Sequence, residues 1–196
     1  MQFRSRQNGV VLIFSLIILL ILLIGAVALM RSMNNSLLTA GNLAFRRDLV
    51  NQGEQAVSTV INEFKTGGAM VGATTANNQA LNYSSTILAT TNQGVPKALL
   101  NNTIFSTVGT SANDITPANY PDVTIRYVVD RLCSATGSAS SALCAQSLAN
   151  PPGGTGGTGA PPVTPPSSTV YRLSVRVSGA RNTQVFLQTT FTMPGS

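Results

Sequence analysis

The sequence predicts an α+β fold in which one long N-terminal helix packs on a C-terminal antiparallel sheet of three or more strands. Three observations predict it: an uncharged apolar run near the N-terminus, apolar residues that continue at helical spacing to residue 65, and strand-like alternation after residue 121. The chain has 196 residues, of which 43% are hydrophobic and 9% are charged. Because about 166 residues follow the apolar run, they can bury a core.

The apolar run extends over Val10–Met30, and only Ser15 and Gly25 in it fall outside the clearly apolar residue types. At about 1.5 Å per residue, a helix of this length spans roughly 31 Å, close to the hydrocarbon thickness of a bilayer. Such a helix satisfies its own backbone polar groups, so lipid can surround it. The residues before it, Met1–Gly9, form a short basic leader.

Three kinds of N-terminal segment fit these first residues. They are an uncleaved membrane anchor, a secretory signal peptide cleaved after Ala28, and a prepilin-type leader cleaved between Gly9 and Val10. An A-x-A pattern ends at Ala28, but the apolar run continues past it and exceeds the roughly 7–15 residues usual in signal peptides. A basic leader with Arg4 and Arg6 that ends in Gly directly before the apolar run has the prepilin arrangement, in which the apolar helix stays in the mature protein.

Helical spacing continues after the run and predicts an amphipathic helix over residues 31–66. No proline occurs before Pro96, and Thr66-Gly67-Gly68 is a typical helix stop. A continuous helix from Val10 to Lys65 would be about 84 Å long. Its first half would lie in lipid or in the core of a fibre, and its second half would pack on a domain. The predicted apolar stripe consists of Leu38, Phe45, Leu49, Ala56, Val60 and Phe64, widened by Ala44, Val57 and Ile61.

Few charged residues occur on this helix. The simpler interpretation is a solvated face, because surface ion pairs contribute little. The alternative is that Arg46, Arg47 and Glu54 contact neighbouring subunits.

The composition argues against most enzyme and metal-binding classes. The chain has no histidine and six carboxylates, and it lacks a nucleophile motif and a phosphate-binding glycine loop. We therefore predict no catalytic residue, no cofactor, no metal and no small-molecule substrate. The formal charge of +6 comes from 12 basic and 6 acidic residues, so the basic balance reflects few acids and makes nucleic acid a poor candidate partner.

Two cysteines, Cys133 and Cys144, lie close together in a Thr/Ser-rich chain of low charge, which suits an oxidising compartment. A disulfide between them would close a short loop and contribute roughly 2.5–3 kcal/mol in the chain-entropy model. Two buried free thiols are the alternative, and a zinc site lacks further ligands. Beyond them, residues 150–168 form a low-complexity Pro/Gly/Thr insert that we expect to be a flexible surface loop.

Period-two alternation predicts three strands in the C-terminal part, the last two joined as an antiparallel hairpin with a Gly-containing loop of about five residues. Their apolar faces consist of Val123, Ile125, Tyr127 and Val129, then Tyr171, Leu173, Val175 and Val177, then Val185, Leu187, Thr189, Phe191 and Met193. The other face would carry Arg126, Arg172 and Arg176, which we interpret as surface charges, because DNA binding needs clustered positive charge. Residues 67–116 predict only short helical or irregular pieces, near 78–81 and 95–100.

Three segments after the apolar run resemble a known family. They read Arg31-Ser32-Met33-Asn34-Asn35, Ala40-Gly41-Asn42-Leu43-Ala44-Phe45-Arg46 and Asn51-Gln52-Gly53-Glu54-Gln55-Ala56. Together with the leader and the apolar run, their order and spacing over Gly9–Ile61 resemble the N-terminal region of PilX-type minor pilins of type IV pili. The match is approximate at Gly53, since that family usually has Ala-Ala-Glu-x-Ala there.

The resemblance implies a pilin-like subunit that promotes initiation or assembly of type IV pili, at or near the tip. It divides the chain into a leader (1–9), a transmembrane and assembly helix (10–30), an amphipathic helix (31–66) and a globular pilin domain (67–196) that contains the 133–144 disulfide loop. It implies cleavage between Gly9 and Val10 by a prepilin peptidase and N-methylation of Val10. We expect subunit contacts through Phe14, Gly25, Arg46, Arg47 and Glu54.

The implied partners are the membrane before assembly, other minor pilins, the major pilin and, as a further candidate, a tip adhesin. Before assembly the chain would be a single-pass inner-membrane protein with a periplasmic C-terminal domain, and after assembly it would lie in the pilus at the cell surface.

One departure from the family pattern is informative. Most pilins carry Glu at the fifth mature position, where it pairs with the N-terminal amine of a neighbouring subunit. If Val10 is the first mature residue, the fifth is Phe14, which suits a subunit at a special site such as the tip. The tip pseudopilin of a type II secretion system also lacks this Glu, although its usual large helical insert finds little room here. A secreted binding module cleaved after Ala28 and a membrane-anchored enzyme remain as alternatives.

Overall fold

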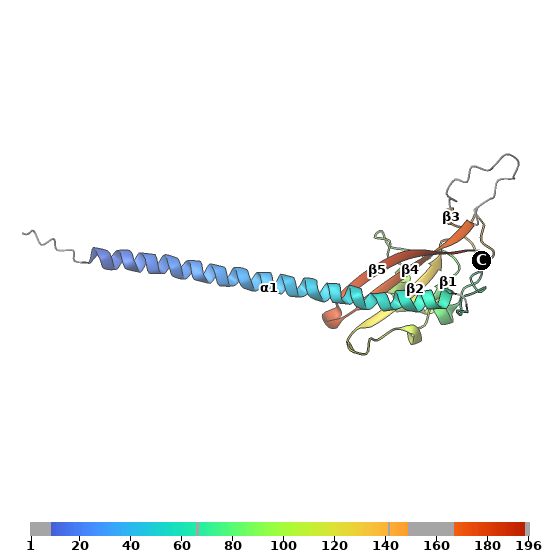
Figure 1. Cartoon of the computed structure of the whole chain (residues 1–196), viewed down its shortest axis with the longest axis horizontal. Coiled ribbons are helices and arrows are strands. Elements are labelled where there is room, and N and C mark those ends of the chain that lie inside the picture. Colours follow the sequence, from blue (N-terminus) through green and yellow to red (C-terminus); the bar gives the residue numbers. More distant parts are fainter. Residues whose placement is uncertain (1–8, 66, 141, 149–166, 195–196) are drawn as a thin grey trace, which may run out of the picture. The chain divides into compact units, whose positions relative to one another are not determined.

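The computed structural model describes residues 9–65, 67–140, 142–148 and 167–194. In these residues a long N-terminal helix is followed by a five-stranded sheet, which confirms the predicted general α+β layout (Figure 1). The chain divides within the helix into two compact units, Met1–Arg47 and Asp48–Ser196. The elements in chain order are α1 (Val10–Phe64), the 3-10 turn η1 (Gln79–Leu81), β1 (Tyr83–Ser84), α2 (Lys97–Leu100), α3 (Asn102–Val108), η2 (Ser111–Asn113), β2 (Thr124–Arg131), β3 (Gln146–Leu148), β4 (Ser167–Ser178), η3 (Ala180–Asn182) and β5 (Gln184–Pro194).

Helix α1 joins the predicted apolar and amphipathic segments in one uninterrupted helix. It ends at Phe64, two residues before the predicted boundary, because the chain turns sharply at Gly67 and Gly68. Gly67 has a φ of +81°, and the Gly68 amide donates to the Lys65 carbonyl over 2.8 Å. A Cβ at Gly68 would lie 2.2 Å from the Glu63 carbonyl oxygen, so the turn requires glycine there.

Strand β4 is the centre of the sheet. Its residues 171–178 pair antiparallel with β2, and β3 pairs antiparallel with residues 167–169. Strand β5 pairs antiparallel with β4 over residues 168–178, on the opposite edge from β2. The predicted hairpin is therefore confirmed, with Gly179–Thr183 between its strands. The insert predicted over residues 150–168 ends earlier than expected, because β4 begins at Ser167, and residues 150–166 lie outside the described residues.

The prediction of a purely antiparallel sheet is wrong at one edge. Strand β1 pairs parallel with β2, so the sheet is mixed. Parallel neighbours need a long crossover connection, which residues 85–123 provide. The two-residue β1 is too short to show a period-two pattern in the sequence, so the sequence does not reveal it.

One face of the sheet is covered by the last turns of α1. Leu49, Ala56, Val60 and Phe64 are buried there, as the stripe predicted, whereas Leu38 is exposed. The ring of Phe64 makes edge-to-face contacts with three aromatic rings at the end of the sheet, those of Tyr83, Tyr171 and Phe191, with centroids 6.0, 5.3 and 5.1 Å away.

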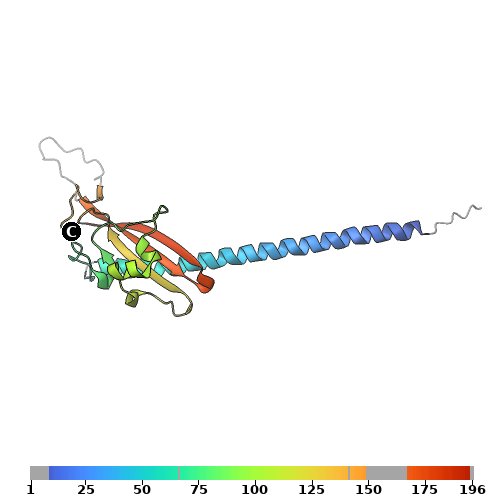
Figure 2. The same cartoon turned by 180° about the vertical axis from the view of Figure 1, so that it is seen from behind.

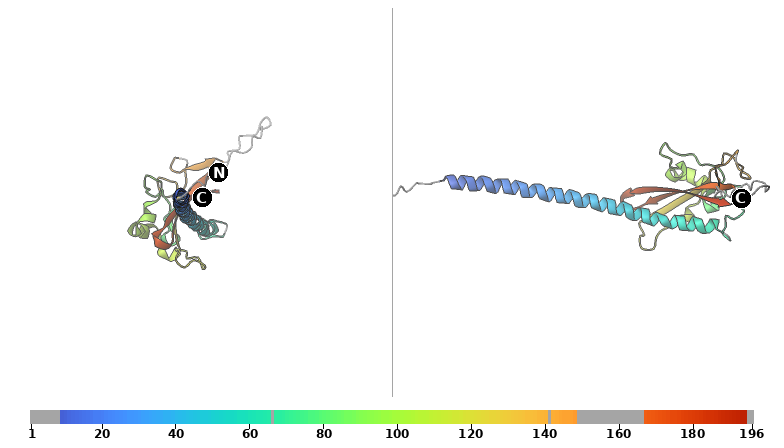
Figure 3. Two further views of the ribbon diagram at one scale, coloured as in Figure 1. Left: turned by 90° about the vertical axis from the view of Figure 1, so that its left-hand side faces the viewer. Right: turned by 45° about the horizontal axis from the view of Figure 1, so that its top comes forward.

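The other face is covered at β2 and β4 by the α2–α3 segment, so these two strands are buried on both sides, whereas the β5 side chains on this face are exposed. Figure 2 shows this green segment in front of the sheet, and the right-hand view in Figure 3 shows the sheet between it and the last turns of α1. A small apolar cluster of Ala98, Leu99, Phe105 and Val128 fills this second layer, with Leu88 and Val108 packed against it. The prediction that this face is a solvated surface is therefore wrong at β2 and β4.

Helix α1 approaches the sheet closely at Gly53, which is buried. A Cβ at this position would lie 2.2 Å from Cδ1 of Leu187 and 3.0 Å from Cγ2 of Val177. Gly53 therefore allows the close contact between the helix and the hairpin, a role that the sequence alone does not indicate.

We predict that Gly53→Leu destabilises the Asp48–Ser196 unit by about 1–3 kcal/mol, the usual cost of overpacking a filled contact. Thermal unfolding followed by near-UV circular dichroism measures the change. Gly41→Leu is the matched control, because a Cβ at Gly41 of the same helix meets nothing within 4 Å. Equal melting temperatures of the two variants would contradict the close contact.

Glu63 lies near the end of α1 with a half-buried side chain. Its Oε2 atom is buried and has no hydrogen-bond partner among the described residues. Burial raises the pKa of this carboxyl above its ordinary value. Burial is also the main reason that the pKa of the Tyr127 hydroxyl rises to about 12, with smaller contributions from the charges of Glu63 and Asp114.

We predict that Glu63→Gln is more stable than the native chain at pH 7. A carboxyl whose pKa is raised by folding favours the folded state when protonated, so native stability falls as pH rises through and above the ordinary Glu value. The difference between variant and native chain should therefore disappear below about pH 4. Chemical unfolding at several pH values measures it, with Glu54→Gln, on an exposed residue of the same helix, as the control.

Candidate functional site

The apolar part of α1 is the largest exposed apolar surface in the described residues. From Val10 to Met30 the large apolar side chains lie between 45% and 69% exposed. The helix is long and apolar enough to span a membrane, and none of its most apolar window is buried in the structure. This surface has the chemistry for contact with lipid or with other apolar helices.

The start of α1 coincides with the predicted cleavage junction. Gly9 has a φ of +91°, a conformation that glycine adopts without strain, and Val10 is the first helical residue. The Gly9 carbonyl accepts the first hydrogen bond of the helix, from the amide of Ile13 over 3.2 Å. Arg4, Arg6 and the rest of the predicted leader before Gly9 lie outside the described residues.

Two predicted contact residues lie on the apolar part of α1. The side chain of Phe14 is 62% exposed. A Cβ at Gly25 would meet nothing within 4 Å, so Gly25 is not required by packing within the described part of this chain. Both positions are free for contact with another helix.

The predicted charged contact residues are exposed. Arg46, Arg47 and Glu54 form no ion pair within the described ranges. Glu54 lines a depression between α1 and the β4–β5 hairpin, together with Gly53, Val57 and Leu187. The structure places Arg46 and Arg47 in the Met1–Arg47 unit and Glu54 in the Asp48–Ser196 unit.

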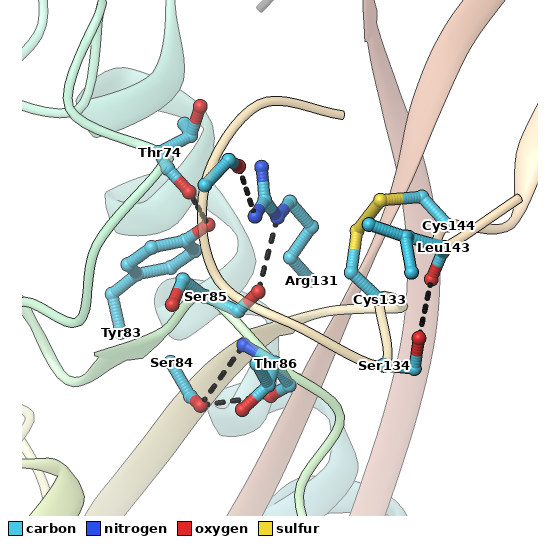
Figure 4. Close-up of a disulfide and its surroundings, with 11 residues drawn as sticks. Thr74, Tyr83, Ser84, Ser85, Thr86, Arg131, Cys133, Ser134, Leu143 and Cys144 are labelled. Carbon is cyan, nitrogen blue, oxygen red and sulfur yellow. Dashed lines mark hydrogen bonds between the residues drawn. A yellow bond between two sulfur atoms is a disulfide. The ribbon is translucent and has the colours of Figure 1, made fainter. Parts of the chain in front are cut away.

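The predicted disulfide joins Cys133 and Cys144 (Figure 4). It closes a loop inserted between β2 and β3, both of which pair with the same edge of β4. At the base of this loop, the Leu132 amide donates to the Val170 carbonyl over 3.0 Å, and the Val170 amide donates to the Ala145 carbonyl over 3.1 Å. The disulfide thus holds two strand segments in line on either side of the insertion.

Arg131 is a buried cation that the sequence reading does not identify. It is the last residue of β2 and is fully buried beside the disulfide loop. Its Nε donates to the Ser85 carbonyl over 3.0 Å, and its Nη2 donates to the Gly137 carbonyl over 2.7 Å (Figure 4). These contacts tie the 134–143 loop and the segment after β1 to the end of the sheet. Arg131 continues the odd-numbered apolar positions of β2, so the alternation in the sequence could have indicated that it is buried.

The three arginines predicted as surface charges instead hold the second layer on the sheet. Arg172 forms a buried ion pair with Asp130, and the same carboxylate accepts the Leu88 amide over 2.8 Å. Arg126 pairs with Asp114, and its guanidinium lies 4.2 Å from the centroid of the Phe105 ring.

Arg176 donates to the Leu99 carbonyl. The alternation that predicts strands cannot reveal this covering layer, because its residues lie far away in the sequence.

In the described ranges, no group of three or more His, Cys, Asp and Glu residues is arranged to hold a metal ion. Comparison of the chain with protein-family models, with curated proteins and with solved structures finds no match. The candidate functional features are therefore the exposed apolar helix, the Gly9–Val10 junction and the exposed charges of α1.

We predict that Asp130→Ala destabilises the Asp48–Ser196 unit by about 3–5 kcal/mol, because it leaves the Arg172 charge buried and unpaired. It also removes the acceptor of the Leu88 amide. Equilibrium unfolding measures the loss, and Asp122→Ala is the control, since Asp122 is exposed at the start of the same region. Equal stability of the Asp130→Ala and Asp122→Ala variants would contradict the buried ion pair between Asp130 and Arg172.

Proposed function

We propose that this chain is a PilX-like minor pilin, a membrane-anchored structural subunit that promotes initiation or assembly of a type IV pilus at or near its tip. The observation that carries the proposal is the start of α1 at Val10, directly after Gly9, followed by an unbroken helix whose apolar part is exposed. A helix of this kind can rest in lipid before assembly and present the same surface to other subunits afterwards.

Cleavage after Gly9 would leave Val10 as a new N-terminus at the first turn of α1. Phe14 then occupies the position where most pilins carry a carboxylate, so this subunit would enter the assembly through apolar packing. Gly25 has no side chain, and a Cβ there would meet nothing within 4 Å, so it allows close approach of another helix. The exposed charges Arg46, Arg47 and Glu54 are available for contacts with other minor pilins or with the major pilin.

The lack of a fifth-position carboxylate supports a special position, since a subunit repeated along the fibre would lose that pairing at every step. In this proposal the chain lies in the inner membrane before assembly, with its C-terminal part in the periplasm. The disulfide suits that oxidising compartment. The sheet and its loops would form the surface that recognises partner subunits.

The N-terminal mass of the mature protein, purified from its native host, tests this function. We expect a chain that begins with methylated Val10. The variant Gly9→Val should keep its leader, because prepilin-type leaders end in Gly directly before the apolar segment. Ser5→Ala, which changes the leader away from the junction, is the control and should be processed normally.

Two results would contradict the proposal. A mature chain that begins at Leu29 would show a conventional secreted protein, and the apolar helix would then be absent from it. A chain that still begins at Met1 would show an unprocessed anchor, and the proposed route of assembly would lose its basis.

A further inference from the structure

Strand β5 forms one edge of the sheet, and no described residue pairs with its outer side. Its pairing with β4 runs through eleven consecutive residues, from Gln184 opposite Ser178 to Pro194 opposite Ser168, without a change of register. The outer side is therefore a long and regular row of backbone donors and acceptors.

The hydrogen bonds of β4 show which residues of β5 face outward. The amide and carbonyl of Val170 bond with Ala145 and Leu132, on the edge away from β5. In an antiparallel pair the bonding direction alternates with each residue, so the even-numbered residues of β4 bond away from β5. Their partners in β5 turn their own backbone groups to the free edge. These partners are Phe186, Gln188, Thr190 and Thr192, and all four are exposed.

This edge lacks the features that usually prevent pairing with another chain. Such features are charged side chains, internal prolines, bulges and short length. Residues 184–193 contain no charge and no proline, and the register has no bulge. Although the whole chain carries a formal charge of +6, a second copy of β5 would meet no like charge along this strand.

The strand is also complementary to itself in one register. Only registers that place even-numbered residues opposite even-numbered residues can form hydrogen bonds across the edge. The register centred on Thr189 overlaps the strand over its full length. It puts Leu187 opposite Phe191 and Val185 opposite Met193 of the second copy, four side chains that are half-buried in one chain. On the opposite face it puts Gln188 opposite Thr190.

We propose that two copies of this chain pair antiparallel through their β5 edges, about a two-fold axis at Thr189. Pairing joins the two sheets into one, satisfies the outward backbone groups and covers the half-exposed apolar row with its own copy. The proposal does not depend on the proposed function, because it uses only the Asp48–Ser196 unit.

The pairing has a consequence for how it must be measured. In this unit Gly53 lies beside Leu187 and Phe64 beside Phe191, so α1 and β5 run in the same direction. Antiparallel pairing therefore places the two Asp48 ends at opposite ends of the joined sheet, so two chains anchored side by side in one bilayer cannot form this pair. Detergent micelles that each hold one apolar helix leave this arrangement unhindered.

The first test uses the full chain in detergent with a single added cysteine. Thr189→Cys should form a disulfide-linked dimer under mild oxidation, because residues on the axis face their own copies with Cα atoms about 4.5 Å apart. Gln188→Cys is the matched control: it is also exposed, but the register puts Thr190 opposite it. The two native cysteines are already bridged to each other, so neither competes.

The second test removes one outward donor. Thr190→Pro deletes an amide that faces the free edge and leaves the bonds to β4 in place, since proline is tolerated on the open side of an edge strand. We expect the dimer, measured by light scattering over a range of chain concentrations, to weaken by about tenfold or more, because both copies lose a bond. Thr190→Ala keeps the amide and should dimerise normally.

Three outcomes would overturn the proposal. One is a native chain that remains monomeric at every concentration. Another is equal cross-linking of the Thr189→Cys and Gln188→Cys variants, which would indicate chance collision of micelles. The third is an unchanged dimer in a folded Thr190→Pro variant. If that variant does not fold, as judged by circular dichroism, the cysteine pair still decides the register.

Discussion

Burial of β4 on both faces and both edges is the constraint on which the rest of the Asp48–Ser196 unit depends. Its odd-numbered residues Tyr171, Leu173, Val175 and Val177 face the last turns of α1 and are buried. Its even-numbered residues face the α2–α3 layer, where Arg172 and Ser174 are also buried. Both edges are paired, with β2 and β3 along one and β5 along the other. A strand in this position needs a covering element on each face. The last turns of α1 cover one face, and the α2–α3 segment, which lies between β1 and β2 in the sequence, covers the other.

The two covering layers are held in different ways. On the α1 side, the contact is apolar and close, with Gly53 against Leu187 and the Phe64 ring among three aromatic rings. On the α2–α3 side, Arg176 donates to the Leu99 carbonyl and Arg126 pairs with Asp114, both outside the strands. Arg172 pairs with Asp130 of β2, and that carboxylate accepts the Leu88 amide of the covering segment. A chain with few charges thus uses several of them inside the fold, where each must be paired because an unpaired buried charge is costly.

The part of α1 before Asp48 differs from the rest of the chain in the exposure of its apolar side chains. Its large apolar side chains, apart from Phe45, are exposed in this chain, so its stability in water would be poor without a lipid or protein partner. The start of the helix at Val10 and the lack of packing around Gly25 agree with a role in assembly, as proposed above. The free β5 edge belongs to the other unit and offers a separate kind of contact, through the backbone rather than through apolar side chains.

Local patterns in the sequence were sufficient for several features. Apolar periodicity predicted α1 and the buried stripe from Leu49 to Phe64, alternation predicted β2, β4 and β5, and the spacing of two cysteines suggested their disulfide. Phe14 became a candidate contact residue through the resemblance to pilins, whereas Gly25 was singled out as a small residue in the apolar run and Glu54 as a charge on the predicted helix; all three remain predictions.

Only the tertiary structure decided what lies against each face. Asn82, for example, donates to the Tyr127 carbonyl and accepts the Thr110 amide, partners 45 and 28 residues away in the sequence. The parallel β1, the burial of Arg172 with Asp130 and the close approach at Gly53 likewise depend on segments that meet only after folding. The sequence alone determined the long helix and the strands β2, β4 and β5, because backbone propensity and periodicity act over a few residues. The fold decided which side chains are buried, because burial depends on contacts between distant segments.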